Sequence, residues 1–401
     1  TTAGKMQVLI TGGKGLLGSR LCREIISKRS MLAADGVISP VEKIILWDRA
    51  VDAGGGGLGS CRSKDGISVQ EVHGDICSDV SVSTLFDQSI SDQMPLSVFH
   101  LASMMSGEGE EKADECFEVN VNGTRRLLGA CRRRAAPTKF LFASSIAAAG
   151  PTPLLSRATR PRPESTYGTT KAMAELLVVD HGRRAAWGVD GRVARVPTVA
   201  VRPGPPNAAS TAAFSNVVKA LAQGQDFSSP LPLDLKHPLI SYKNAISCFI
   251  QLHDLEEQSL HQDRVVNFPA LVTSIADIAE VTLELLHNGL HNYNNTTDNK
   301  YGIIDGSSVL GQQKQENHLP TPKVTEHIDV QFTQLVLSMA TAVEESHTFV
   351  VGGLYEDRKK EKGQSDQQNT GDKNNMFAGN NSKEELKELI CEYLKEARGG
   401  V

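Results

Sequence analysis

The first half of the chain alternates short apolar runs with longer stretches in which apolar residues recur at helical intervals. The apolar runs have the length of strands and lie at residues 6–11, 43–48, 67–75, 97–103 and 139–145. Strands that alternate with helices in this way are typical of α/β folds with a parallel sheet. We therefore predict a Rossmann-type doubly wound parallel sheet over residues 1–202, with residues 264–268 returning to it as a further strand.

The pattern changes in the second half, where helical periodicity is confined to a few segments. Helices are predicted at residues 208–223, 242–255, 273–286 and 383–398. Stretches near 290–320 and 356–383 are polar and rich in Lys, Asn, Gln and Gly, a composition typical of mobile insertions. We predict that residues 238–270 return to the first domain, and that residues 203–237 and 271–401 form a smaller C-terminal substrate-binding cap.

A glycine-rich turn follows the first predicted strand. Gly12, Gly15 and Gly18 stand in the pattern Gly-x-x-Gly-x-x-Gly, and the next helix carries Leu21 and Ile25 on its apolar face. Such glycines permit a tight turn and a close approach of a pyrophosphate to the backbone, while the helix amides face the phosphates. A glycine turn that binds no nucleotide is the alternative, but the strand before it and the helix after it favour a dinucleotide site.

Acidic residues end the second and third predicted strands. Asp48 follows the glycine motif at the distance of a second strand, where a carboxylate accepts hydrogen bonds from ribose hydroxyls and repels a 2′-phosphate. This position favours NAD over NADP, although Arg49 could serve a 2′-phosphate or stack on adenine. Asp48 could instead cap a turn. Asp75, after the third strand, is suited to the amino group of adenine.

Tyr167 and Lys171 are four residues apart, which puts a phenol and an ammonium on one face of a helix. The pKa of tyrosine is about 10 when unperturbed, so Tyr167 can act as a base near neutral pH only if positive charge stabilises the phenolate. A charge at about 4 Å contributes on the order of 4 kcal/mol at an effective dielectric constant of about 20. Ser145 brings a hydroxyl to the same edge of the sheet. His100 lies within an apolar strand and is interpreted as a core residue.

The amino-acid composition argues against nucleic-acid-binding, zinc-binding, disulfide-rich and membrane-spanning proteins. The 401 residues include 42 Lys and Arg against 47 Asp and Glu, and this net charge of -5 argues against nucleic-acid binding. Seven cysteines form no Cys-x-x-Cys pair, so neither a zinc site nor a disulfide framework is indicated. No apolar run approaches the roughly 18 residues of a membrane span, and no signal peptide precedes the first strand. We expect a cytoplasmic protein without a metal, although a targeting segment upstream of Thr1 could have been removed.

Together these motifs resemble the extended short-chain dehydrogenase/reductase superfamily, which contains NAD-dependent epimerases and dehydratases. The shared motifs occur in the family order: the glycine turn, Gly74-Asp75, His100-Leu-Ala102, Asn120-Val-Asn-Gly-Thr124, Ser144-Ser145, and Tyr167 with Lys171. The resemblance implies that Tyr167 is the general base, that Lys171 holds the nicotinamide ribose and lowers the pKa of the tyrosine, and that Ser145 orients the reacting hydroxyl. The residues it implies for contact with NAD are Gly12, Gly15, Leu16, Leu17, Gly18, Asp48, Asp75, Ile76, Leu101, Ala102, Asn120, Tyr167, Lys171, Pro197 and Thr198.

Segments 103–110, 165–177 and 195–207 are also similar to the D-erythronate dehydrogenase family, and this similarity covers most of residues 5–285. It implies oxidation of the 2-hydroxyl of D-erythronate, a small sugar acid, to the 2-keto acid with NAD. A glycine-rich run at 53–59, interpreted as a flexible loop, and the polar C-terminal segments depart from this family.

An acidic substrate needs hydrogen-bond donors near the nicotinamide end of the cleft. Arg202 is the strongest choice because a guanidinium can pair with a carboxylate through two hydrogen bonds, although it could also cover the rim between domains. Glu108, Glu110 and Glu111 are interpreted as a solvated face because carboxylates repel an acidic substrate. The candidate substrate residues are Ser103, Ser106, Ser145, Tyr167, Arg202 and Asn207.

Other activities remain open from the sequence. A dehydratase needs an acid beside the active-site hydroxyl, but Ser145 is followed by Ile146 and three alanines. A sugar-nucleotide 4-epimerase is the main alternative, disfavoured because residues 203–240 carry only Lys219 and Lys236 as cations. Threonine dehydrogenase and a non-catalytic NAD(P)-binding sensor are further alternatives, and the intact Ser, Tyr and Lys disfavour the sensor.

The expected partners are NAD and a small sugar acid, with neither nucleic acid nor membrane. Residues 116–134 and 167–184 would, by the same resemblance, form a four-helix interface across a twofold axis. We therefore predict a homodimer.

Overall fold

The computed structural model describes residues 4–50, 61–62, 66–156, 158–203, 210–260, 262, 264–287, 322–328 and 381–398. Three predicted features lie outside these residues: the glycine-rich run at 53–59, Asn207, and the polar insertions except for residues 381–383.

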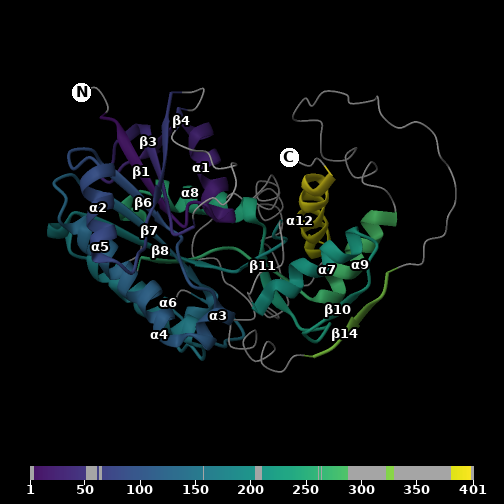
Figure 1. Cartoon of the computed structure of the whole chain (residues 1–401). Helices are drawn as coiled ribbons and strands as arrows, with labels where there is room; N and C mark the ends of the chain where they lie inside the picture. Colours follow the sequence, from purple (N-terminus) through teal and green to yellow (C-terminus); the bar gives the residue numbers. More distant parts are fainter. Residues whose placement is uncertain are drawn as a thin grey trace, which may run out of the picture.

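A large sheet forms the first part of the molecule (Figure 1). Its strand β1 (Met6–Thr11) pairs in parallel with β6 (Leu96–His100) on one side and with β3 (Ile38–Asp48) on the other. The chain winds outward from β1 in both directions, so the crevice of a doubly wound sheet opens at the carboxyl ends of β1 and β6. The full strand order is β12 (Val265–Asn267), β8 (Val189–Val196), β7 (Thr138–Ser145), β6, β1, β3, β5 (Ser68–His73) and β4 (Cys61–Arg62).

The neighbouring strands from β12 to β5 all pair in parallel, which confirms the predicted Rossmann-type sheet. Two short strands are not predicted by periodicity. The first is β2 (Ser30–Leu32), which pairs antiparallel with the start of β3, and the second is β4, which pairs antiparallel with β5. Strands of two or three residues are too short to show an alternating pattern, so only their pairing reveals them.

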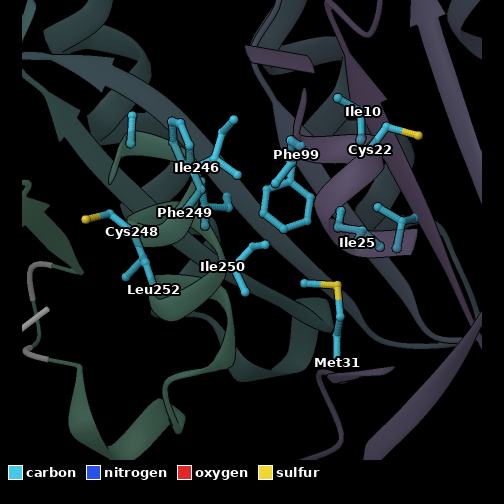
Figure 2. Close-up of a cluster of buried hydrophobic side chains, with 14 of the residues drawn as sticks. Ile10, Cys22, Ile25, Met31, Phe99, Ile246, Cys248, Phe249, Ile250 and Leu252 are labelled. Carbon is cyan, nitrogen blue, oxygen red and sulfur yellow. The ribbon is translucent and has the colours of Figure 1, made fainter. Parts of the chain in front are cut away.

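One face of the sheet is covered by α1 (Leu16–Lys28) and α8 (Tyr242–Asp254). Figure 2 shows Ile25 of α1 and Phe249 of α8 on either side of Phe99, which projects from β6. Helix α8 is therefore part of this layer, although it begins more than forty residues after strand β8 in the sequence.

The opposite face is covered by α2 (Asp79–Ser89), α5 (Thr124–Arg132) and α6 (Thr166–Gly182). Leu9 packs into this layer, whereas Ile10 packs into the layer of α1 and α8. Because successive strand residues point to opposite faces and both faces are buried, the strands are continuously apolar rather than alternating.

A second hydrophobic cluster lies apart from the sheet (Figure 1). It is built from α7 (Ala213–Ala222), α9 (Ile275–His287) and α12 (Asn381–Arg398), with Phe214 and Ile390 fully buried. These helices and α8 confirm the helices predicted in the second half. The predicted boundaries between a sheet domain and a cap stay a prediction.

Short strands connect the two parts. The chain leaves the large sheet after β8. The next strand, β9 (Thr198–Val199), pairs in parallel with β11 (His237–Ile240), which also pairs with β13 (Leu271–Thr273). β10 (Phe227–Ser229) pairs with β14 (Val324–Glu326) beside the second cluster. Among the helices within the described ranges, none has the length and apolarity needed to cross a membrane.

The motif at residues 120–124 forms the middle of a longer helical run. α4 (Ala113–Phe117) continues into a π-helical turn, η1 (Glu118–Gly123), and then into α5. Gly123 is required there, because a Cβ atom would lie 2.8 Å from Cγ1 of Ile76. π-helical turns are frequent at functional sites, and this one buries Asn120.

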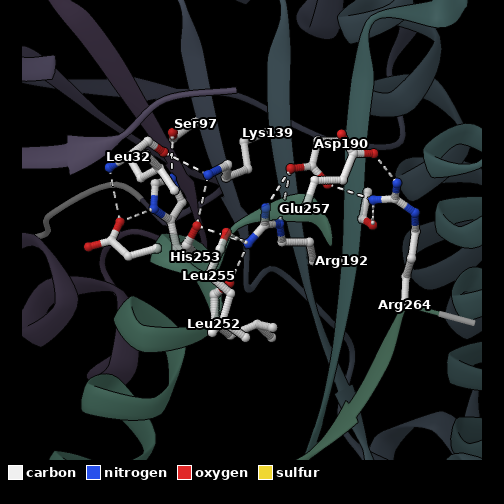
Figure 3. A network of polar contacts seen from close by, with 12 residues as sticks. Leu32, Ser97, Lys139, Asp190, Arg192, Leu252, His253, Leu255, Glu257 and Arg264 are labelled. Carbon is white, nitrogen blue, oxygen red and sulfur yellow. Dashed lines mark hydrogen bonds and ion pairs between the residues drawn. The ribbon is translucent and has the colours of Figure 1, made fainter. Parts of the chain in front are cut away.

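A buried ionic network anchors the end of α8 beneath the amino ends of the strands (Figure 3). Arg192 of β8 donates to Oδ2 of Asp190 at 2.6 Å and to the carbonyl oxygens of Leu252, His253 and Leu255 at 2.6, 3.0 and 2.8 Å. The last carbonyls of a helix have no partner within the helix. The guanidinium therefore completes the hydrogen bonding of α8.

Two further cations extend this network. Lys139 of β7 donates to the carbonyl oxygens of Leu32 and His253 at 2.7 and 2.9 Å, and burial lowers the pKa of this lysine to about 8. Arg264 donates to Oδ1 of Asp190 at 2.7 Å. The network therefore joins β2, β7 and β8 to the end of α8.

We expect Arg192→Met to lower the free energy of unfolding by about 3 kcal/mol or more, because it leaves buried carbonyls without their charged donor. Urea unfolding followed by circular dichroism measures the change. Arg183→Met is the control, since Arg183 forms an exposed pair with Asp180, and it should leave the stability nearly unchanged. Equal effects of both substitutions would contradict the role given to Arg192.

The outer face of α6 would form part of the interface in the predicted homodimer. Met173 and Leu176 are 41% and 68% exposed there, while Val178 on the inner face is fully buried. We expect Leu176→Asp to shift the protein from dimer to monomer in light scattering at micromolar concentration, because a charge would be buried at the interface. Leu154→Asp, at an exposed leucine outside this helix, should leave the mass unchanged. A monomeric mass for the unmodified protein would exclude the dimer.

Candidate active site

The glycine turn lies at the carboxyl end of β1, where the backbone leaves no space for side chains. Gly12 has φ +67°, and a Cβ atom there would lie 3.0 Å from the amide nitrogen of Ala102. A Cβ atom at Gly18 would lie 2.3 Å from the carbonyl oxygen of Gly12. Gly15 is the N-cap of α1, and within the described residues no side chain caps this helix. These features fit a dinucleotide, whose pyrophosphate binds at helix amides close to bare backbone.

Asp48 lies next to this turn at the end of β3. Its Oδ2 accepts a hydrogen bond from the backbone amide of Lys14 at 3.0 Å, and its Oδ1 accepts one from the amide of Ala50 at 3.0 Å. The two backbone contacts orient the carboxylate, and a carboxylate retains further lone pairs for ribose hydroxyls. Asp48 therefore caps a turn and also lies where the sequence predicts the adenosine ribose.

Asp75 follows β5 and starts a local turn, in which its Oδ1 accepts from the amide of Cys77 at 2.9 Å. Ile76 packs against Gly123. Gly74, just before them, is confined by the ring of Trp47, whose Nε1 would lie 2.1 Å from a Cβ atom. Asp48 and Asp75, the acidic residues predicted to contact the adenosine part of NAD, thus lie at the ends of the neighbouring strands β3 and β5.

Leu101 and Ala102 close the other side of the crevice at the end of β6. The amide of Ala102 donates to Oγ1 of Thr11 at 3.1 Å, which joins the ends of β6 and β1. The ring nitrogens of His100 lie 2.7 Å from Oγ1 of Thr11 and 2.9 Å from Oγ1 of Thr124. Burial lowers the pKa of this histidine to about 3. His100 is therefore an uncharged core residue, as predicted.

Tyr167 and Lys171 lie in the first turns of α6, which begins where the side chain of Ser165 accepts a hydrogen bond from the amide of Gly168. Ser145, at the end of β7, lies close enough to Tyr167 for its hydroxyl to lower the pKa of the phenol. The Nζ atom of Lys171 lies 5.6 Å from the centre of the Tyr167 ring. The fold thus brings together the three residues for which the sequence predicts catalysis.

The electrostatics of the pair differ from the expectation. Burial raises the pKa of Tyr167 to about 12, against the opposing effects of the nearby Ser145 hydroxyl and Arg202. Burial also lowers the pKa of Lys171 to about 7, and its Nζ donates to the carbonyl oxygen of Ala143 at 2.8 Å. The role of Lys171 in lowering the pKa of the tyrosine stays a prediction.

A buried ion pair behind these residues was not predicted from the sequence. Glu175 of α6 binds Arg195 of β8 through two hydrogen bonds of 2.9 and 2.7 Å, and Ser144 of β7 donates to the same carboxylate at 2.5 Å. All three side chains are almost fully buried. Glu175 lies one helical turn after Lys171, and this spacing is the only sequence signal that could have indicated it.

Asn120 uses its side chain to hold protein segments together. Its Oδ1 accepts from the amide of Met104 at 2.9 Å and from the hydroxyl of Ser103 at 3.1 Å, and its Nδ2 donates to Oγ1 of Thr170 at 3.0 Å. Thr170 precedes Lys171 in α6. Asn120 therefore connects the loop after β6 to the helix of the candidate base.

Glu110 is not simply part of a solvated face. It lies in α3 (Ser106–Glu111), and its carboxylate accepts hydrogen bonds of 3.3 Å from the hydroxyl of Thr166 and the amide of Tyr167. A carboxylate near the amino end of α6 interacts favourably with the helix dipole. The prediction that Glu110 is only a surface charge was wrong, because it took no account of the contact between α3 and α6.

The NAD contacts predicted just after β8 and the remaining candidate substrate residues lie in different parts of the site. Pro197 and Thr198 are buried, and Oγ1 of Thr198 lies 2.7 Å from Nε2 of His237. Arg202 is held by the carbonyl oxygen of Val199 at 2.9 Å and interacts electrostatically with Tyr167. Ser106 is buried at the start of α3, and Ser103 is bound to Asn120.

The sequence profile of the NAD dependent epimerase/dehydratase family matches residues 8–266 of this chain. D-erythronate dehydrogenase of Cupriavidus necator is 33% identical over 71% of this chain and 83% of that protein. D-erythronate dehydrogenase of Haemophilus influenzae is 30% identical over 70% of this chain and 84% of that protein.

Solved structures share the fold at lower identity. A nucleoside-diphosphate-sugar epimerase from Agrobacterium tumefaciens has a TM-score of 0.68 and 23% identity, and the match covers 99% of this chain and 96% of that one. L-threonine dehydrogenase from Clostridium difficile has a TM-score of 0.65 and 19% identity, with 98% and 99% covered. The matched profile spans the glycine turn, the three candidate catalytic residues and the return strand β12. This chain belongs to the NAD dependent epimerase/dehydratase family.

Proposed function

We propose that this protein is an NAD-dependent dehydrogenase that oxidises the 2-hydroxyl of a small sugar acid, with D-erythronate, which becomes 2-keto-D-erythronate, as the leading substrate. The observation that carries the proposal is that Ser145 and Lys171 both lie beside Tyr167, at the end of the sheet that bears the glycine turn. The two relatives named D-erythronate dehydrogenase support the substrate class.

In the proposed reaction, Tyr167 removes the proton of the substrate hydroxyl while Ser145 holds the same oxygen by a hydrogen bond. NAD, when bound, supplies the hydride acceptor and the positive charge of its oxidised ring. With a pKa of about 12, Tyr167 needs positive charge near its hydroxyl before it can act as a base near neutral pH. Arg202 lowers the pKa of Tyr167, and Lys171, whose Nζ lies 5.6 Å from the ring centre, supplies a second positive charge when it is protonated.

Arg202 is proposed to bind the substrate carboxylate. It is held by Val199, interacts with Tyr167, and lies close enough to Lys219 to lower the pKa of that lysine, after the larger effect of burial. Arg202 beside the candidate base, with Lys219 near Arg202, favours an anionic substrate. This arrangement suits an acid better than it suits L-threonine, which carries its own ammonium group.

The residues after Ser145 disfavour dehydration. Ile146, Ala147 and Ala148 form a buried 3-10 turn directly after Ser145. None of these side chains can transfer a proton, whereas elimination needs an acid and a base. The remaining family alternative is a sugar-nucleotide 4-epimerase.

A panel of C4 sugar acids, L-threonine and UDP-sugars tests the proposed substrate. We expect NADH to accumulate with D-erythronate. NADH formation with L-threonine alone would overturn the sugar-acid assignment. Interconversion of UDP-sugars without net NADH would favour the epimerase instead.

We expect Tyr167→Phe to lower kcat by roughly 10²- to 10⁴-fold, because it removes the proton acceptor. NAD affinity measured by calorimetry should stay nearly the same, since only the hydroxyl is lost. Tyr242→Phe is the matched control: Tyr242 is a buried tyrosine of α8 that donates to Glu396 at 2.6 Å, away from the candidate site. Turnover retained in Tyr167→Phe would defeat the assignment.

We expect Arg202→Met to lower kcat/KM for the sugar acid roughly 30-fold or more, mainly through KM, because the half-buried charge partner of the carboxylate is lost. Steady-state kinetics with unchanged NAD binding measures this. Lys236→Met is the control, since Lys236 forms an exposed pair with Asp277. A fall in kcat at unchanged KM would assign Arg202 to Tyr167 rather than to the substrate.

A further inference from the structure

We propose that a basic pocket between α2 and α5 binds a phosphate-rich small molecule of the nucleoside triphosphate type. The pocket has a volume of about 620 Å³ and is lined by residues of α2, of α5 and of the chain from the end of α6 to Trp187. Figure 1 shows α2, α5 and α6 on the same face of the large sheet. The inference concerns a second site and does not depend on the proposed sugar-acid activity.

The pocket is separate from the candidate active site. Tyr167 lies in the first turns of α6, whereas His181, which lines the pocket, lies in the last turn. The rise of the helix puts these two residues about 20 Å apart along its axis. Trp187 ends the next short turn, η3 (Ala185–Trp187), just before β8 begins. A ligand in the pocket therefore does not occupy the crevice at the carboxyl ends of the strands.

Gly129 lies at the centre of the arginines that line the pocket. The residues three and four positions before and after it are Arg125, Arg126, Arg132 and Arg133. Residues at these spacings share one face of a helix, so four guanidinium groups surround a position that has no side chain. A Cβ atom at Gly129 would lie 3.6 Å from Nη1 of Arg133. A larger side chain at this position would therefore fill the space between the arginines.

Most of the positive charge in the pocket has no acidic partner. Nε of Arg126 lies 3.0 Å from Oδ1 of Asp79, and its Nη1 lies 2.6 Å from Oε1 of Glu118. Among the residues that the structure describes, no carboxylate forms an ion pair with the other three arginines. The dipole of α5 places only about half a negative charge at its carboxyl end. The pocket therefore attracts anions, although the whole chain has a net charge of -5.

Trp187 holds one of these arginines in place. Cζ of Arg132 lies 3.9 Å from the centre of the Trp187 ring, within the range of a cation–π interaction. The ring of His181 meets the same indole edge-on, with 4.6 Å between the ring centres. A guanidinium that is already positioned loses less conformational freedom when it binds a ligand. Its fork of donors matches the oxygens of a phosphate group.

The size and lining of the pocket favour an organic phosphate over a single inorganic ion. Its volume lies within the range of small-molecule sites, about 300 to 1,000 Å³. Helix α2 contributes Val80 and Val82 to the lining, and Val80 is 74% exposed. A nucleoside triphosphate offers several phosphate groups to arginines on different turns of α5 and an organic part to the apolar residues of α2.

Calorimetric titration of ATP into the protein saturated with NAD tests the inference. NAD keeps ATP out of the dinucleotide site, and no substrate is needed, so the result is independent of the sugar-acid assay. We expect saturable binding that weakens as salt is added, because the contacts are charged. Adenosine, which has no phosphate, should not bind. Failure of ATP to bind, or binding of adenosine as tight as that of ATP, would overturn the inference.

Two variants separate a shaped site from a diffuse positive surface. Arg133→Met should weaken ATP binding roughly tenfold or more, because a phosphate ligand is lost. Arg183→Met is the matched control, since Arg183 pairs with Asp180 and does not line the pocket, and it should leave ATP binding nearly unchanged. Gly129→Leu keeps every charge but fills the space between the arginines, and it should also weaken ATP binding roughly tenfold or more. Normal ATP binding by Gly129→Leu would exclude the pocket.

The predicted homodimer provides a further test, because its interface includes α5 and α6 but not α2. We expect Leu176→Asp, the variant designed to separate the two copies, to bind ATP as tightly as the unmodified protein. ATP binding by Leu176→Asp alone would show that a second copy of the chain covers the pocket, and it would contradict the inference.

Discussion

The buried ion pair between Glu175 and Arg195 is the constraint on which the candidate active site depends. It joins α6 to β8, and the hydrogen bond from Ser144 adds β7 to the same point. Tyr167 and Lys171 are two turns and one turn, respectively, before Glu175 in α6, and Ser145 is next to Ser144. A carboxylate this deeply buried is tolerated only when charged donors satisfy it, so the orientation of the helix relative to the strand ends is closely determined.

Desolvation in this buried site shifts the pKa values of its titratable groups. Burial moves the pKa values of Tyr167 and Lys171 in opposite directions, to about 12 and about 7, so both groups favour their uncharged forms. A base in such a site becomes active only when positive charge arrives beside it. The dependence on NAD that defines the family fits this requirement, because the oxidised cofactor carries such a charge when bound.

The amino ends of the strands hold a different buried network, around Arg192, which serves the packing of α8.

The dinucleotide end of the crevice combines family features with features of this chain. The close contacts at Gly12 and Gly18 follow from the family turn, which no larger residue could form. The ion pair of Lys14 with Glu71 is a property of the particular residues at these positions.

The residue order alone was sufficient to predict the parallel sheet, the glycine turn, the main helices and the Ser145, Tyr167 and Lys171 triad, because strand length, helical period and the glycine pattern are properties of short segments. Other features depend on residues that are distant in sequence. The contact of Glu175 with Arg195, the proximity of Arg202 to Tyr167 and the pairing of Lys14 with Glu71 arise from strand register and helix packing. Periodicity carries no information about which distant charges meet, and the degree of burial that shifts their pKa values exists only once the layers have packed.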